Sequence, residues 1–65
     1  MYPETTDLKL TKLRTATINA LFRNDIYTVG EVRRVPDRLL MRMPWIGRKS
    51  IAEIRCILGD HIEPR

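Results

Sequence analysis

The stretch that decides the fold is Met43–Ser50, with the sequence MPWIGRKS. Pro44 ends a preceding helix, because the residue before a proline is pushed out of helical geometry. Gly47 then precedes two cations and a hydroxyl, and apolar residues recur at helical spacing from Ile51 to Leu58. A helix start carries unpaired N–H groups and partial positive charge, so this stretch predicts an anion site. For a basic protein without catalytic groups, the expected anion is a nucleic-acid phosphate.

Length and charge support that expectation. The 65 residues make one small domain, 43% hydrophobic and 31% charged, with a thin core and no room for a deep substrate cavity. The formal net charge is +4, and between Arg33 and Lys49 six basic residues face a single acidic one, Asp37. Such a concentration favours a polyanionic partner. For three of these cations two alternatives stay open, contact with phosphate or solvation by water. The three are Arg34, Arg38 and Arg42.

Other function classes find little support. Cys56 is the single cysteine, and neither it nor His61 has a partner at the spacing of a metal site or a catalytic triad. The glycine spacing of a nucleotide-hydrolysing phosphate loop is missing too, so we expect no metal, no cofactor and no enzyme activity. No apolar run approaches the ~20 residues that span a bilayer, and the N-terminus is acidic where a signal peptide is basic. The sequence predicts a soluble cytoplasmic protein without membrane contact.

The first half of the sequence predicts an arm and one helix. Residues 1–10 have no sustained period, so we expect an extended arm held by Leu8 and Leu10. Thr11 is placed to cap a helix over Lys12–Arg23. One side of that helix is expected in the core, and the other forms a candidate contact face. The core side has Leu13, Thr17, Ala20, Leu21 and Asn24, and the contact face has Lys12, Ala16, Asn19 and Arg23.

Two short helices are predicted next. Asn24-Asp25 tolerate the turn that ends the first helix. The segment Thr28–Glu31 has the form of a capping box, and Gly30 within it is expected to permit close approach of another backbone. Pro36 suits the first turn of a third helix. In that helix the side chains expected to face inward are Leu39, Leu40 and Met43. Those expected to face outward are Arg38 and Arg42.

The last helix is predicted to run to Leu58 and to end at Gly59. In the turn before it, Ile46 and Trp45 are expected in the core, with base stacking as the less favoured alternative for Trp45, and Gly47 is expected to supply backbone freedom. Residues 60–65 are expected to be a frayed tail after a domain over residues 11–59. The prediction is an all-α, compact bundle of four to five short helices.

The segment Leu39–Leu58 resembles a helix-hairpin-helix unit, through the apolar-Gly-x-Lys-Ser pattern of Ile46–Ser50. Over Leu13–Leu58 the sequence resembles the C-terminal domain of the bacterial RNA polymerase alpha subunit. The residues that carry this resemblance are Leu13, Asn19-Ala20-Leu21, Ile26–Val32, Leu39-Leu40 and Pro44–Ile54.

The resemblance implies binding to the minor groove of A·T-rich upstream promoter DNA, with contacts to RNA polymerase subunits, sigma factor or activators. The matching DNA contacts are Asn19, Gly47, Lys49 and Ser50, with Arg48 beside them and Glu53 in a neighbouring acidic position. The family's groove-inserting arginine is replaced by Ala16, and a family lysine by Phe22. Lys12 and Arg23 share a helical face with Asn19 and are the candidate substitutes, whereas Arg14 lies well off that face.

The segment Asp7–Thr11 resembles the residues that precede the family's first helix, but it lies about three residues too far upstream. Either Lys12–Arg14 is an insertion or the likeness is accidental. The family's contacts with sigma factor are therefore not transferred to Asp7.

The main hypothesis is a non-catalytic transcription module of the cytoplasm, associated with the nucleoid, that binds duplex DNA. The alternative is a protein-protein interaction module that keeps the fold but has lost minor-groove binding, with Phe22 and Glu53 as possible protein contacts. An enzyme ranks third, because only the basic helix start suggests one.

Overall fold

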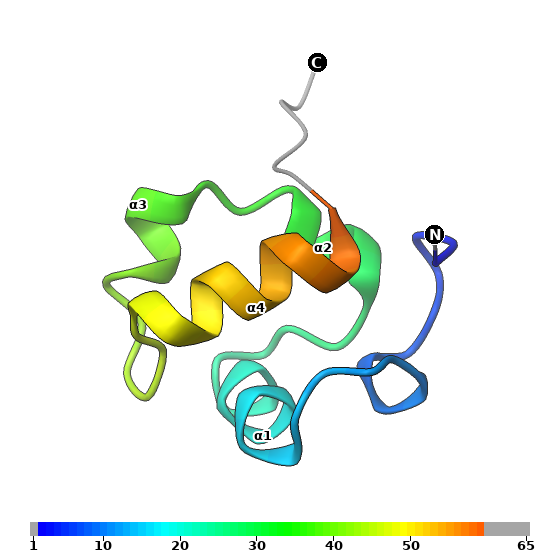
Figure 1. Cartoon of the computed structure of the whole chain (residues 1–65), viewed down its shortest axis with the longest axis horizontal. Coiled ribbons are helices and arrows are strands. Elements are labelled where there is room, and N and C mark those ends of the chain that lie inside the picture. The colour runs from blue at the N-terminus through cyan, green and yellow to red at the C-terminus, as the bar shows by residue number, and fades with distance from the viewer. Residues whose placement is uncertain (1, 60–65) are drawn as a thin grey trace.

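The computed structural model describes residues 2–59 and confirms an all-helical protein. A 3-10 helix, η1 (Leu8–Leu10), precedes four α-helices: α1 (Thr15–Arg23), α2 (Val29–Arg33), α3 (Asp37–Leu40) and α4 (Arg48–Leu58). In Figure 1 α4 crosses the centre of the view, with α1 below it and α3 above. Within residues 2–59 the single strand-like contact is an isolated antiparallel bridge between Asp7 and Thr28. No helix in this range has both the length and the apolar character needed to cross a membrane. The frayed tail predicted for residues 60–65 lies outside the described residues.

The core draws on every helix and on the loops between them. Seven of its side chains are almost completely buried, and burying each one contributes about 1.5–3 kcal/mol relative to exposure. Thr17, predicted on the core side of the first helix, is 3% exposed. The buried apolar residues are Leu8, Leu13, Ile18, Ala20, Leu21, Ile26, Val29, Val32, Leu40, Ile46, Ile51, Ile54 and Leu58.

Three of the predicted helix-end signals are confirmed. Thr28 and Glu31 form the capping box, in which the Glu31 amide donates to the Thr28 hydroxyl and the Glu31 carboxylate accepts from the Thr28 amide. Asp25 has a φ of 62° just after α1, the left-handed turn expected for this pair of residues. Gly59 closes α4 with a φ of 96°, which favours glycine.

The N-terminal arm differs from the prediction. It is not extended throughout, because Asp7 caps η1 by accepting from the Lys9 amide. Leu8 is completely buried as expected, but Leu10 is 74% exposed, so the prediction for Leu10 is wrong. In a single 3-10 turn, successive side chains point in different directions, and only one of the two leucines reaches the core.

The first α-helix is shorter than predicted, and Thr11 does not cap it. The Thr11 hydroxyl donates to the Leu8 carbonyl and accepts from the Leu13 amide, so it closes η1 instead. α1 begins at Thr15, with Arg14 in the capping position, and the Arg14 side chain makes no capping hydrogen bond. Lys12 therefore lies outside the helix, and the prediction that it shares a helical face with Asn19 is wrong.

The third helix is also shorter than predicted. It ends at Leu40, with Met41 as the capping residue, so it stops before Pro44 could end it. A helix of four residues offers one inward position, which Leu40 occupies with no exposure. Leu39 lies about 100° away around the axis and is 43% exposed, so the prediction that it faces inward is wrong. Arg38 and Arg42 are exposed, as expected.

Gly30 allows the close backbone approach that the sequence predicted. Its amide donates to the Glu4 carbonyl at 2.8 Å. A Cβ at this position would lie 2.9 Å from the Glu4 Cβ and 3.0 Å from the Glu4 carbonyl oxygen. The missing side chain is what lets the arm lie against α2.

We therefore expect Gly30→Ala to destabilise the fold by about 1–3 kcal/mol, the usual cost of overpacking, even though alanine favours helices. Urea unfolding followed by circular dichroism measures this change. Adding Glu4→Gly removes the nearer clash and should restore part of the loss. A Gly30→Ala protein as stable as the parent would contradict this account of the arm.

Candidate nucleic-acid interface

The start of α4 is open and cationic. Gly47 occupies the capping position in an extended conformation, with φ −116° and ψ −175°, and the helix has no capping hydrogen bond from a side chain. A Cβ on Gly47 would meet no atom within 4 Å. Arg48 and Lys49 follow, both exposed. The first-turn amides thus have no side-chain cap, and two exposed cations lie in the same turn, an arrangement suited to an anion.

One expectation about this start is wrong. Gly47 does not use the conformational freedom of glycine, because its φ lies in the ordinary region for any residue. What the glycine provides is an unobstructed approach to the helix start. The left-handed residue of the hairpin is Trp45, with a φ of 73°.

Trp45 is not a core residue, so the prediction that placed it there is wrong. It is 72% exposed, while its neighbour Ile46 is 5% exposed and fills the core position of the turn. The guanidinium of Arg23 lies over the indole, 5.2 Å from the ring centroid. The Asn24 side-chain amide donates to the carbonyls of Ala20 and Pro44, at 2.8 and 3.2 Å, and so holds the hairpin against the end of α1.

Between α1 and the hairpin lies a shallow hollow of about 240 Å³, which we call the α1 hollow. Two predicted contact residues, Asn19 and Arg23, meet there. Both are exposed, and the hairpin then leads directly to Gly47 and the α4 start. The structure does not bring Lys12 into this set, since it precedes α1 and its backbone amide donates to the Tyr2 hydroxyl. The hollow is lined by Ala16, Asn19, Ala20, Arg23 and Trp45.

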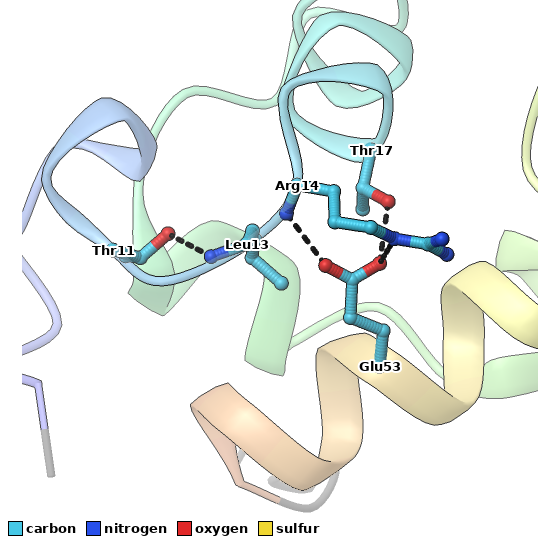
Figure 2. A network of polar contacts seen from close by, with 5 residues as sticks. All are labelled: Thr11, Leu13, Arg14, Thr17 and Glu53. Atoms are coloured by element: carbon cyan, nitrogen blue, oxygen red, sulfur yellow. Dashed lines mark hydrogen bonds and ion pairs between the residues drawn. The ribbon is translucent and has the colours of Figure 1, made fainter.

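Glu53 has an internal role that the sequence did not reveal. Its carboxylate accepts from the Arg14 amide at 2.6 Å, from the Thr17 hydroxyl at 2.7 Å and from the Arg14 Nε at 3.2 Å (Figure 2). The side chain is 12% exposed. It thus supplies the negative charge that the N-terminus of α1 otherwise lacks. A separation of 39 residues in sequence leaves no local pattern from which to predict this contact.

The network also sets the acidity of this group. Burial raises the pKa of Glu53, but the hydrogen bonds from the Arg14 amide, the Thr17 hydroxyl and the Arg14 guanidinium, with the charge of Arg14, outweigh burial and lower the pKa below its usual value. The carboxylate is therefore charged in the folded protein at neutral pH.

The remaining predicted residues are spread over the surface. Phe22 is half-buried, with its ring 5.6 Å from the Tyr27 ring and 5.7 Å from the Lys9 amine. Arg34 pairs with Glu4 at 2.7 Å, so the charge of this member of the basic cluster is partly neutralised within the protein. Within residues 2–59, no three His, Cys, Asp or Glu side chains gather in a way that would hold a metal ion.

Two short helices joined by a hairpin, with a basic and uncapped start to the second, define a small module of the helix-hairpin-helix class. The family model for the C-terminal domain of the alpha subunit of bacterial RNA polymerase matches residues 5–60 of the 65, so the protein belongs to this family. The family is a non-catalytic domain of the polymerase, and membership implies a DNA-binding module related to transcription. Comparisons with curated proteins and with solved structures give no match.

The Glu53 network predicts a dependence of stability on pH. The lowered pKa means that Glu53 stabilises the fold above its unfolded pKa of about 4.3, and that this contribution is lost as pH falls through the lower folded value. We expect Glu53→Gln to cost about 1–3 kcal/mol at pH 7 and to flatten the loss of stability below pH ~4.3.

Urea unfolding at several pH values measures both effects. Glu4→Gln is the matched control, because its pair with Arg34 is exposed and contributes at most about 1 kcal/mol. If the two variants were equally stable at neutral pH, Glu53 would not have the structural role described here.

Proposed function

We propose that the protein binds duplex DNA through the open start of α4 and the exposed face of α1. The observation that carries this proposal is the α4 start, where the first-turn amides have no competing side-chain cap and nothing obstructs Gly47. A backbone phosphate would accept from these amides while Arg48 and Lys49 neutralise it and the Ser50 hydroxyl donates. Phosphate contacts of this kind fix position without reading sequence.

The face of α1 supplies the second half of the proposed interface. Asn19 is exposed there and would reach base edges in the minor groove, while Arg23 supplies the cation that Ala16 cannot. Lys12, exposed before the start of α1, remains a weaker candidate for a phosphate contact. The proposed ligand is an A·T-rich upstream promoter duplex, whose narrow groove attracts cations.

The cellular setting follows from the family. As a polymerase domain, the module would work in the cytoplasm on nucleoid DNA and would contact other polymerase subunits, sigma factor or activators. The match to residues 5–60 covers the proposed domain over residues 11–59 and part of the proposed arm.

The second candidate is a protein-protein interaction module without groove binding. Ala16 favours it, because this exposed position offers no cation to the groove. Phe22 and Glu53 give it less support, since the first is half-buried and the second is engaged with α1. Chemical-shift mapping distinguishes the two, because duplex DNA should perturb Asn19 together with Gly47–Ser50, whereas a protein partner would leave that set unchanged.

The DNA proposal predicts salt-dependent binding. With two or three phosphate contacts, the logarithm of affinity should fall with the logarithm of salt with a slope of about −2 to −3. Lys49→Ala should reduce that slope by about 1 and weaken all sequences alike. Fluorescence anisotropy of a labelled A·T-rich duplex at several ionic strengths measures this, and a G·C-rich duplex tests uniformity.

Arg34→Ala is the matched control, since it removes the same charge from a residue already paired with Glu4. Absence of duplex binding at low salt would refute the DNA proposal. A sequence-selective loss in Lys49→Ala would refute the phosphate role of that residue alone.

Gly47→Ser tests the helix start without removing charge. The new hydroxyl would cap α4 by accepting from a first-turn amide, which should leave stability unchanged or raise it by a few tenths of a kcal/mol. It would also compete with phosphate for the same amides, so duplex affinity should fall. Thermal unfolding and anisotropy measure the two effects, and unchanged affinity in a well-folded Gly47→Ser protein would show that these amides do not bind DNA.

A further inference from the structure

Trp45 is the most unusual residue on the surface. It is the single tryptophan of the sequence, it is 72% exposed, and its backbone has a φ of 73°. Positive φ is unfavourable for a bulky residue, and strained residues of this kind cluster at binding sites. The fold gains little burial from this indole, because Ile46 fills the adjacent core position. The placement of Trp45 therefore requires an explanation outside the core.

The α1 hollow, which Trp45 lines, offers such an explanation. Ala16 and Ala20 contribute only methyl groups, and Trp45 forms an aromatic boundary. The volume of about 240 Å³ is below that of sites for drug-sized ligands, about 300–1,000 Å³, and suits a single planar ring. Within residues 2–59 the Asn19 side chain makes no hydrogen bond, so both its donor and its acceptor are available.

We propose that the α1 hollow binds one unpaired nucleobase, stacked on Trp45, and that the module thereby binds single-stranded DNA. The inference rests on the proposed phosphate contact at the α4 start. Gly47 follows Trp45 by two residues, a reach of at most about 7 Å. A base on the indole and a phosphate at the helix start would thus belong to the same or to neighbouring nucleotides.

The geometry favours an unpaired base over a base within a duplex. In a duplex, neighbouring bases cover both faces of each base, and its pairing edge is occupied by the partner strand. A single strand presents both, so the base can stack on the indole while the Asn19 amide contacts its edge. Because the Arg23 guanidinium lies over one face of the indole, 5.2 Å from the ring centroid, the base would stack on the opposite face, with Arg23 as a nearby cation.

A tryptophan that wedges between stacked base pairs would need both faces of its ring uncovered. Here the indole borders a hollow, Arg23 lies over it, and Asn24 holds the hairpin through the Pro44 carbonyl. These contacts fix the ring beside α1. The wedge is therefore an outcome for the experiment to exclude.

The single tryptophan makes the test direct. The 65-residue protein is titrated with a short oligothymidine strand and with a duplex of the same length. Stacking on Trp45 should quench tryptophan emission with the single strand. Trp45→Ala should weaken single-strand binding about 5- to 150-fold, the usual range for one base stacked on an aromatic ring, with duplex affinity changed less than about 3-fold. Trp45→Phe should retain part of the affinity, and Trp45→Leu should not.

Two controls separate the site from the fold. Trp45→Gly suits the φ of 73°, so it should keep or raise stability while losing the same affinity as Trp45→Ala. One nucleotide of the strand is also replaced by an abasic residue. This should lower the affinity of the parent protein, but it should lower the affinity of Trp45→Ala much less, because the two changes remove the same contact.

Any of the following outcomes overturns the proposed base site. Duplex binding without single-strand binding refutes the base site and leaves the proposed function intact, whereas absence of both refutes both. Single-strand binding that is insensitive to Trp45→Ala shows that the hollow is not used. Equal loss for duplex and strand, with duplex bending measured by end-to-end energy transfer, assigns Trp45 to a wedge instead.

Discussion

The arrangement of α1 and the start of α4, the two elements of the proposed interface, depends on the carboxylate of Glu53. α1 has no capping residue of its own that makes a side-chain hydrogen bond, and its N-terminus is completed by an acid from α4 that accepts from the Arg14 amide and the Thr17 hydroxyl. The same contact joins the helix that carries Asn19 to the helix whose start carries the cations. An acidic group beside a proposed anion site need not repel the ligand here, since Glu53 is largely buried and Arg14 neutralises it locally.

Arg55 makes the complementary connection on the other side of α4. Two residues along a helix turn the side chain by about 200°, so Glu53 and Arg55 point in nearly opposite directions. Arg55 is 11% exposed in its side chain, pairs with Asp37 at 2.7 Å, and donates to the carbonyls of Val32 and Val35. One acid and one base on α4 thus tie it to α1 and to the α2–α3 segment respectively. In a protein with a thin core, these two polar contacts fix orientations that apolar packing leaves less defined.

The sequence predicts features that depend on residues within about four positions of each other. The Thr28–Glu31 capping box, the turn at Asp25 and the end of α4 at Gly59 are all of this kind, and all are found. The Thr11 hydroxyl is able to cap a helix that follows it, but it donates instead to the Leu8 carbonyl in the preceding turn. Other predictions depended on where each helix begins and ends. Leu39, for example, faces out because α3 is only one turn long.

The sequence predicts only the part of the candidate site that depends on a local pattern. The α4 start can be located from the glycine, the cations and the hydroxyl in order along the sequence. The partners of Glu53 and Trp45 lie 22 or more residues away in sequence, at or within α1, and only the fold brings them together. An aromatic residue beside a hairpin glycine gives no local indication of whether it faces the core, and here the neighbouring Ile46 takes the core position.

The resemblance puts Ala16 where the family has a groove-inserting arginine, and Ala16 and Trp45 line the same hollow. Ala16 contributes only a small side chain to the lining of this hollow, so it leaves space there that a longer side chain would compete for. A small residue at position 16 and an exposed indole at Trp45 thus together favour the proposed base contact over a cation inserted into a narrow groove. The phosphate contacts proposed at the α4 start do not depend on this choice.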